Sequence, residues 1–533
     1  MNLGRSSAMI AAGTLASRVT GLLRSIVLVS AIGAGGLGAD AFAIANQMPN
    51  YIFQVISTGV LTAVFVPQIV KWSQEEDGGR RLLSKLFTLA TVILLAVTVI
   101  ATVIAPLLIG LISSFQTDAQ YELAVAFAYW CIPQVFFYGM FALVGETLNA
   151  RGIFAPYAWA PITNNIVSIA GFGLFMWLFG PGRRDIEAYD GTMIVFLGLT
   201  ATLGIVAQTV VLFAFWRRTG LRLSPDFHWR GMGLGQLRRV ATWSVGMLLV
   251  GLVVSAVQQR VITTASSDAV VNASSNMWFN AWLVFMLPYS LIVMSIGTPY
   301  FTQLSHHAHA GRHDAVKSDM NTAIKTLGLL VVFAAVTLMA AAVPAARIFS
   351  SDLAEAEATA PVLISFLVAL VPMAVLFIVQ RTFYAYGDTR TPFFFTLFQA
   401  AIAIAGSLAT PLIFLHGGLT AGVALVQSIS STLQVLLAIF LLRRKLGGLR
   451  IGGGLWAIVR FTLAALPAGA AGFAIYLWAG GADGWMAQGK ILAVLACALI
   501  GTVSLAIYVG VLALFRAPEL KQIGSLVRSR LGR

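Results

Sequence analysis

The chain has 533 residues, of which 59% are hydrophobic and only 10% are charged, and its mean hydropathy is +0.87. Soluble globular chains carry roughly a quarter charged residues, so this composition excludes an ordinary soluble enzyme, a disordered protein and a secreted disulfide scaffold. It indicates an integral membrane protein. In a soluble protein the net charge of +14 would suggest nucleic acid as a partner. The positions of the basic residues decide whether the charge reflects such a partner or the orientation of the chain in the membrane.

Apolar stretches long enough to cross a bilayer recur along the whole chain. A membrane helix needs about 20 predominantly apolar residues. We therefore expect an all-α integral membrane fold with about fourteen transmembrane helices, near residues 9–33, 41–70, 86–112, 121–148, 156–179, 192–216, 240–264, 270–303, 324–349, 359–384, 393–415, 418–442, 456–479 and 489–515. The first stretch is not a cleaved signal peptide, because it carries two arginines and no small-residue cleavage site follows it.

The basic residues predict the orientation. With the N-terminus inside and the helices alternating, 27 of the 34 Lys and Arg fall inside, 5 fall outside and 2 lie within the first helix. An excess of Lys and Arg on the cytoplasmic side is the rule for membrane proteins. We therefore expect a multi-pass protein with both termini in the cytoplasm, and nucleic acid is not predicted as a partner. Cys131 and Cys497 lie in apolar runs and are expected to be small buried residues.

A weak internal repeat suggests two lobes. GLTA at 198–201 recurs at 418–421, and each copy leads into an apolar helix that ends in a basic pair. Because six helices return the chain to the same side, the repeats are parallel. The expected parts are an N-terminal six-helix lobe (1–222), a C-terminal six-helix lobe (223–450), and two extra helices with a basic cytoplasmic tail (451–533). Two such lobes around a central cavity form a transporter architecture.

Two arginines stand where lipid is expected. An ionised side chain inside the bilayer is costly and is usually functional. Arg18 and Arg24 lie six residues apart, which separates them by ~9 Å along a helix and by about 120° around it. Arginine offers a planar fork that suits phosphate. Alternatively, the long side chain of Arg18 reaches the inner membrane interface instead of a cavity. Arg24 lies deeper in the helix, so this alternative is weaker for it.

Four other charged residues are candidates with structural alternatives. Asp40 follows the glycine-rich turn GAGGLG and is either an N-cap of the second helix or a partner for a first-helix arginine. Glu146 pairs either with Arg151 or with a first-helix arginine. Arg260 is either an anchor at the outer edge or the second lobe's cation facing the cavity. For Asp388, in an inner loop, a solvated ion pair is the simpler interpretation.

The remaining patterns are weak. GAGGLG matches a dinucleotide fingerprint but follows a membrane helix instead of a strand. His306, His307, His309 and His313 lack the spacing and partners of a metal site. The chain has no nucleophile elbow, no phosphate-binding loop and no HExxH motif, so we expect neither an enzyme nor an ATPase, and no metal site.

Three segments resemble one family. SRVTGLLRSIVLVSAIGAGGLGADAFAIANQMPN from Ser17, followed by GVLTAVFVPQI, is similar to the opening of the MurJ/MviN family. NARGIFAPYAWAPITNNI from Asn149 and FYAYGDTRTP from Phe383 resemble two further family segments. The likeness covers essentially the whole chain, in order. The family consists of lipid II flippases within the multidrug/oligosaccharidyl-lipid/polysaccharide exporter superfamily.

The resemblance implies a function in peptidoglycan and cell-wall synthesis, which also supports cell shape. The chain would flip undecaprenyl-pyrophosphate-linked lipid II from the inner to the outer leaflet of the bacterial cytoplasmic membrane by alternating access. The family's cavity residues carry over to Arg18, Arg24 and Asp40, with Arg260 as a further candidate for substrate binding and Glu146 and Asp388 as candidate gates or ion pairs. The two extra helices would hold the polyprenyl tail. Coupling to sodium, protons or the membrane potential is expected, since no nucleotide site is present.

The chain also departs from the family pattern. Many members carry basic residues and a glutamate in the middle of helix two, where this chain has Phe53, Gln54 and Thr58, and many carry an arginine in helix eight, where it has Trp282 and Leu283. Three alternatives therefore stay open: Arg260 supplies the missing charge, the substrate is another polyprenyl-linked glycan, or the chain is a divergent member, with weak activity or as a scaffold that contacts other cell-wall proteins without transport. An exporter of cationic drugs is less favoured, because only Asp40 and Glu146 offer carboxylates within the membrane. A membrane glycosyltransferase is disfavoured, because no acidic cluster or large outer domain is present.

Overall fold

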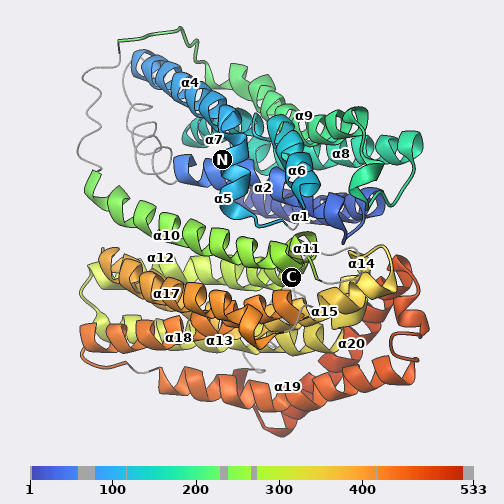
Figure 1. Cartoon of the computed structure of the whole chain (residues 1–533). Coiled ribbons are helices and arrows are strands. Elements are labelled where there is room, and N and C mark those ends of the chain that lie inside the picture. Colours follow the sequence, from blue (N-terminus) through green and yellow to red (C-terminus); the bar gives the residue numbers. More distant parts are fainter. Residues whose placement is uncertain are drawn as a thin grey trace. The chain divides into compact units, whose positions relative to one another are not determined.

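The computed structural model describes residues 3–57, 79–115, 117–228, 238–265, 273–414, 418–449 and 451–519 (Figure 1). Within these ranges the chain is helical and forms no β-strand. Thirteen helices of the described part are long and apolar enough to cross a membrane. The predicted all-α membrane fold is confirmed.

Contacts divide the chain into two compact units. Unit 1 comprises residues 1–269 and 274–276, and unit 2 comprises residues 270–273 and 277–533. The predicted lobes (1–222 and 223–450) rest on a sequence repeat, which this division by contacts does not test, so their boundaries stay a prediction.

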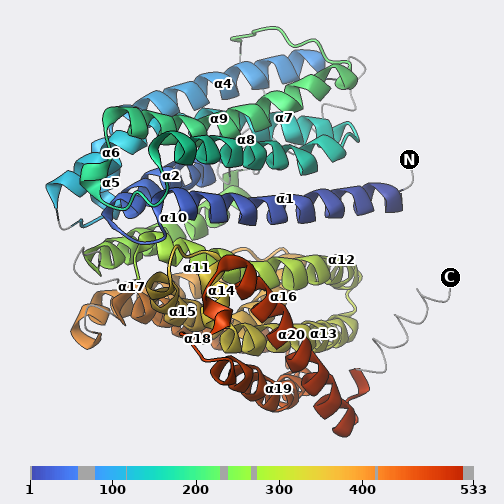
Figure 2. The same cartoon turned by 90° about the vertical axis from the view of Figure 1, so that its right-hand side faces the viewer.

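Unit 1 contains nine of the described α-helices. They are α1 (Leu3–Ile32), α2 (Leu37–Ile56), α4 (Arg80–Val103), α5 (Ala105–Ile112), α6 (Asp118–Cys131), α7 (Gln134–Ala150), α8 (Ala155–Phe179), α9 (Gly191–Trp216) and α10 (Arg238–Ile262). Within this unit α4, α7, α8 and α9 lie side by side, and α1 packs along α8 (Figure 2).

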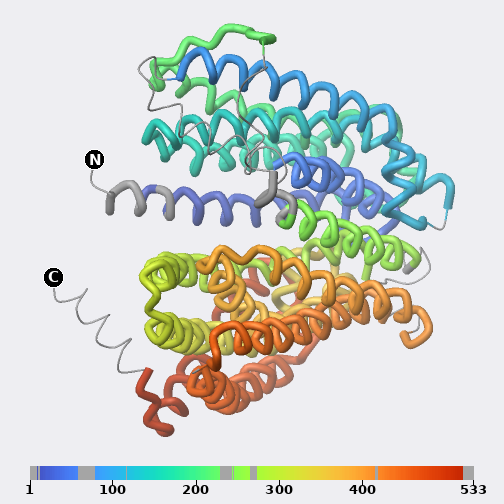
Figure 3. Tube along the Cα trace, turned by 90° about the vertical axis from the view of Figure 1, so that its left-hand side faces the viewer, coloured from blue at the N-terminus to red at the C-terminus, as the bar shows by residue number. Residues whose placement is uncertain are grey.

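The next helices form unit 2, except that the first residues of α11 belong to unit 1. They are α11 (Ser275–Pro288), a π-helix at Tyr289–Met294, α12 (Ser295–His309), α13 (His313–Ala340), α14 (Ala342–Ile348), α15 (Leu353–Leu367), α16 (Leu370–Ala385), α17 (Arg390–Ile413), α18 (Leu419–Lys445), α19 (Gly452–Trp478) and α20 (Lys490–Leu514). In this unit α13 packs against α16 and α19, and α17 lies along α18 (Figure 3). Short 3₁₀ turns join several of the helices in both units.

Each of the fourteen predicted stretches contains helix where it is described. The stretch 41–70 corresponds to α2, which begins earlier than expected, at Leu37, and is described only to residue 57. Five predicted stretches are interrupted instead of continuous. Proline explains two of the breaks: Pro106 lies in the first turn of α5 and Pro133 directly precedes α7, and a proline supplies no N–H to the preceding helical turn.

Small residues let neighbouring helices approach closely. A Cβ on Gly171 of α8 would lie 2.3 Å from Cγ2 of Thr200 of α9, and a Cβ on Gly204 of α9 would lie 2.2 Å from Oδ1 of Asn164. Membrane helices gain little from the hydrophobic effect against each other, so close van der Waals packing at such residues holds them together.

Candidate functional site

The rotation of α1 is set by α8. The Asn165 side chain of α8 donates hydrogen bonds to the Ser17 carbonyl (3.0 Å) and to the Thr20 hydroxyl (2.9 Å). Arg24 follows Ser17 by seven residues, about two helical turns, and therefore lies on the same face of α1. Arg18 follows Ser17 by one residue and lies about 100° away, on the flank of the helix.

Arg24 is half-buried inside unit 1 and interacts electrostatically with Tyr138 of α7. The Tyr138 ring stacks on Phe53 of α2, with the ring centres 5.5 Å apart and the planes inclined by 26°. In the described part of the chain, no carboxylate lies within ion-pair distance of Arg24. Three helices thus place an arginine, a phenol and an aromatic ring together, with the positive charge available to an anion.

Asp40 is fully buried (0% exposed) and does not cap its own helix. Its Oδ1 accepts a hydrogen bond from the backbone N–H of Asn276 (2.9 Å), in the first turn of α11. The Asn276 side chain in turn donates to the Gly33 carbonyl (3.2 Å). Of the two alternatives for Asp40, the N-cap of the second helix is therefore wrong: the carboxylate satisfies an N–H at the start of α11, where a negative charge is favourable.

The glycine-rich turn before Asp40 is a tight connection. Gly33 and Gly36 have φ of +86° and +103°, values that side-chain-bearing residues rarely adopt. Arg184 lies against this turn, and its carbonyl accepts a hydrogen bond from the Gly38 N–H (3.0 Å). The turn thus serves to position Asp40 inside unit 1.

Glu146 of α7 is half-buried, and its side chain hydrogen-bonds with Asn149. It forms no ion pair with Arg151 or with the first-helix arginines Arg18 and Arg24, all four being described residues. The structure therefore does not bring it together with either of its two expected partners.

Arg260 lies at the end of α10, in unit 1, and is exposed. Its guanidinium donates to the Gly110 carbonyl of α5 (3.0 Å), close to where Thr263 accepts from the Ser114 N–H (2.8 Å). This contact ties α10 to the C-terminal end of α5. Arg260 and Gly110 both belong to unit 1, and a role of Arg260 as a cation that faces the cavity stays a prediction.

Asp388 precedes α17, and both of its carboxylate oxygens accept hydrogen bonds. One carboxylate oxygen accepts from the Thr391 N–H (2.9 Å), and the other accepts from the Thr391 hydroxyl (2.9 Å) and from Nζ of Lys445 (2.6 Å). Burial alone would raise the pKa of Asp388, but these hydrogen bonds outweigh it and hold that pKa below its usual value. The carboxylate thus joins the start of α17 to the end of α18.

Two of the four histidines of the predicted inner loop contact single polar side chains. His307 lies 2.7 Å from Asp319 and His313 lies 2.7 Å from the Tyr386 hydroxyl. Among the described residues, no group of three or more His, Cys, Asp or Glu side chains is placed to hold a metal ion.

One cation was missed by the sequence reasoning. Arg381, in the last turns of α16, is half-buried between the rings of Phe301 (5.1 Å) and Phe377 (5.0 Å). It also interacts electrostatically with Tyr289 and Tyr384. Cation–π contact with aromatic faces suits a guanidinium in a site with little water. The only signal in the sequence is its position three residues before the end of the predicted apolar stretch 359–384.

Aromatic rings occupy two positions at which the family resemblance leads us to expect charge. Phe53 stacks on Tyr138 beside Arg24. Trp282 of α11 stacks on Phe285 (5.0 Å) and meets Phe366 of α15 edge-on (5.2 Å). Thr58 lies outside the described residues. At positions 53 and 282, ring packing takes the place of charge.

Comparisons with known proteins agree over most of the chain. The sequence model of the family described as "Lipid II flippase MurJ" matches residues 28–495. The chain is 25% identical over 485 residues to a probable lipid II flippase MurJ of Haemophilus influenzae, covering 84% of this chain and 91% of that protein. It is 25% identical over 540 residues to one of Synechocystis, covering 98% and 96%.

Solved structures share the fold. "Lipid II flippase MurJ, inward closed conformation" superposes with a TM-score of 0.71 at 19% identity, covering 95% of this chain and 98% of that one. An inward-facing transporter of the multidrug resistance MATE family superposes with a TM-score of 0.64 at 15% identity, covering 81% and 94%. With the family match over residues 28–495, the chain belongs to the lipid II flippase MurJ family of membrane proteins.

Proposed function

We propose that this chain flips lipid II, the undecaprenyl-pyrophosphate-linked peptidoglycan precursor, from the inner to the outer leaflet of the bacterial cytoplasmic membrane. Membership of the MurJ family supports the substrate class. Alternating access of the two lobes is the mechanism that the sequence repeat suggests.

The observation that carries this proposal is Arg24. An arginine inside a membrane segment normally has a carboxylate partner or serves a ligand, and no described carboxylate lies within ion-pair distance of this one. A pyrophosphate accepts bidentate hydrogen bonds from a guanidinium. The phenol of Tyr138, which interacts electrostatically with Arg24, is a second candidate donor.

The other candidates take lesser roles in this proposal. Arg18, on the flank of α1, meets the headgroup when it enters or leaves. Asp40 is a positioning residue in this proposal, because its carboxylate accepts a hydrogen bond from the first turn of α11 and holds that turn in place. Arg260 remains a candidate for substrate binding, and Arg381 is a further candidate cation, in unit 2.

The cycle needs an energy source, and the membrane potential or an ion gradient is the proposed one. A pyrophosphate carries about two negative charges, and moving one elementary charge through 100 mV corresponds to about 2.3 kcal/mol. Sodium or proton coupling belongs to this proposal, and so does the cytoplasmic location of both termini.

A scaffold without transport is the second candidate. It is favoured by the aromatic rings at Phe53 and Trp282, which stand at positions where the family resemblance implies charge. A pocket with fewer cations holds a pyrophosphate less tightly. A flippase for a different polyprenyl-linked glycan would use the same arginine.

The test is complementation. A bacterial host is depleted of its own flippase, this chain is expressed, and growth and the amount of lipid II in the outer leaflet are measured. We expect the wild-type chain to rescue both, and Arg24→Ala to reduce lipid II exposure at least about tenfold, for the loss of one charge-assisted contact. Arg24→Lys should be intermediate, because it keeps the charge without the planar fork.

The matched control is Arg443→Ala, which removes an exposed arginine from the end of α18 and should rescue fully. Equal membrane amounts of each variant are verified by immunoblot. Full rescue by Arg24→Ala would show that headgroup binding does not depend on this arginine. A wild-type chain that is well expressed but gives no rescue would favour the scaffold or another glycan, and binding of purified protein to pyrophosphate lipids separates those two.

A further inference from the structure

One side of α2 carries three amide side chains. Gln47, Asn50 and Gln54 follow one another at intervals of three and four residues. They therefore lie within about 60° of each other around the helix and span about 10 Å along it. All three are half-buried. These three residues are called the amide face of α2 below.

The amide face points away from the side through which α2 packs into unit 1. In the same part of the helix the buried side chains lie about 170° around the helix from the amides: Ile44, Ala45, Met48, Pro49 and Ile56. The core of unit 1 thus covers one side of α2, and the amides are on the other.

Most of the hydrogen-bonding capacity of the amide face is unused within the described part of the chain. Gln54 Nε2 donates to Asn50 Oδ1 over a long distance (3.4 Å), inside the same helix. Among the described residues, the side-chain N–H groups of Asn50, the side-chain oxygen of Gln54 and the amide of Gln47 have no further partner. Each such side chain offers two donors and an acceptor oxygen with two lone pairs.

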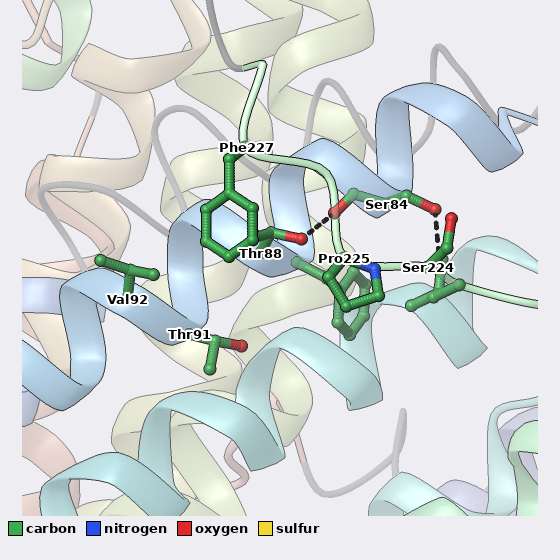
Figure 4. A pocket seen from close by; sticks show the side chains of 9 residues that line it. Ser84, Thr88, Thr91, Val92, Ser224, Pro225 and Phe227 are labelled. Carbon is green, nitrogen blue, oxygen red and sulfur yellow. Dashed lines mark hydrogen bonds between the residues drawn. The ribbon is translucent and has the colours of Figure 1, made fainter.

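Other polar side chains of unit 1 bond to a second element. Asn46, which lies on the α7 side of α2, accepts a hydrogen bond from Gln134 (3.4 Å). Where residues 221–228 lie along α4 and form a groove of about 360 Å³, the Ser84 hydroxyl accepts a hydrogen bond from the Ser224 N–H (3.3 Å) (Figure 4). Such bonds are the ordinary structural use of polar side chains between membrane helices. Within the described ranges, the amide face makes no bond of this kind.

The amide face is also unsuited to lipid. An amide without a hydrogen-bond partner is costly in hydrocarbon, and polar side chains inside membrane segments mark the paths of water or substrate. α2 is less apolar than the thirteen described helices that could cross a membrane, as expected for a helix with one side against water. Neither helix packing nor lipid contact thus accounts for the three amides.

The amide face begins beside the residues proposed to bind pyrophosphate. Phe53 directly precedes Gln54 and stacks on Tyr138, which interacts electrostatically with Arg24. Asn50 lies about one turn along the helix from Gln54. When the phosphates of a ligand meet Arg24, the group bonded to them is therefore close to the amide face.

We propose that the amide face of α2 binds the sugar of the lipid-linked substrate. The inference rests on the proposed function, in which Arg24 holds the pyrophosphate, because the group bonded to the pyrophosphate of a polyprenyl-linked glycan is a sugar. Hydroxyl and N-acetyl groups of a sugar donate and accept hydrogen bonds as amides do. At position 54 the family resemblance leads us to expect charge, and an uncharged amide there suits a sugar better than it suits a phosphate.

The experiment compares two lipids that differ by one sugar. Purified full-length protein in detergent is titrated with undecaprenyl pyrophosphate and, separately, with undecaprenyl-pyrophosphate-linked N-acetylglucosamine. The ratio of the two dissociation constants is measured for each variant. Because neither lipid carries a peptide, this ratio reports recognition of the sugar alone.

We expect the wild-type chain to bind the sugar-bearing lipid about tenfold more tightly, which corresponds to about one or two net hydrogen bonds. The double variant Asn50→Leu/Gln54→Met keeps side chains of similar shape without their amides, and it should bind both lipids equally. Arg24→Ala should weaken the binding of both lipids by a similar factor and so keep their ratio.

The matched control is Asn46→Leu, which removes an amide from the same helix and breaks the contact with Gln134. It should lower the thermal unfolding midpoint in detergent and leave the ratio of the two dissociation constants unchanged. Partial unfolding of a variant lowers the binding of both lipids together, so it does not mimic a loss of sugar recognition.

Two results would overturn the inference while the proposed function stands. One is equal affinity of the wild-type chain for both lipids, and the other is a preference for the sugar-bearing lipid that survives the double variant. Wild-type protein that binds neither lipid would overturn the inference as well, and the complementation test then shows whether the proposed function falls with it.

Discussion

Two carboxylates illustrate what single residues do in this protein. Asp40 and Asp388 were both candidates for handling substrate or ions, and both accept hydrogen bonds from backbone N–H groups in or just before the first turn of a helix. Such N–H groups have no partner within their own helix, and a carboxylate is the best acceptor for them. Their roles in the fold can therefore be tested separately from transport.

Removing the Asp40 carboxylate should destabilise unit 1. Asp40→Ala leaves the buried Asn276 N–H without this acceptor, at a cost of about 1–3 kcal/mol. Asp40→Asn keeps an acceptor oxygen and should lose less. The measurement is the thermal unfolding midpoint of the purified protein in detergent. Equal midpoints for wild type and Asp40→Ala would mean that the hydrogen bond contributes nothing to stability.

Asp388 should make stability depend on pH at the acidic end. Its folded-state pKa is lowered from the usual value of 3.8, so its contribution is present above that value and is lost as the pH falls through the folded pKa. The unfolding midpoint of Asp388→Asn should lie below that of wild type by a constant amount from about pH 8 to about pH 5. The gap should close below about pH 4. A gap that widens on acidification would contradict this sign.

At the scale of helices, the sequence predicted where membrane helices lie but not where they are interrupted. Apolar runs of about 20 residues predict membrane helices well, because the bilayer forces backbone hydrogen bonds to be made within the segment. A run of hydrophobic letters does not show where a helix is interrupted. Pro106 and Pro133 were visible signals for two breaks, whereas the π-helix at Tyr289–Met294 has no such mark beyond the preceding Pro288.

Close packing of α8 against α9 gives a matched pair of variants. Gly171→Ala places a Cβ 2.3 Å from Thr200, whereas Gly173→Ala, two residues along the same helix, meets nothing within 4 Å. We expect Gly171→Ala to cost about 1–3 kcal/mol and Gly173→Ala to be neutral or stabilising by up to about 1 kcal/mol. Thermal unfolding in detergent measures both. If the two variants lose the same stability, the close contact is not what limits residue size at position 171.

For the whole molecule, the distribution of basic residues predicts the orientation in the membrane. With Cys131 and Cys497 replaced, a single cysteine at the exposed Asp483 should react with an impermeant maleimide in intact cells. A cysteine at the exposed Ala310 should react only after the membrane is opened. We expect a labelling difference of at least about tenfold between the two sites, since 27 of the 34 basic residues lie on the side predicted to be cytoplasmic. The reverse pattern would invert the proposed direction of transport.

The sequence by itself determined the membrane class, the positions of the helices and the family, because each depends on local composition or on short contiguous segments. The arginine at position 24 could also be singled out, since a charge within an apolar run is visible without a fold. Its neighbour Tyr138, the acceptor role of Asp40 toward Asn276, and the aromatic contacts of Arg381 could not be predicted. These depend on how helices far apart in the chain are rotated and packed, and hydropathy carries no information about rotation when a helix is apolar on every side. Only the tertiary structure decided which polar groups meet, and it laid residues 221–228 along α4 to form a groove that neither segment shows alone.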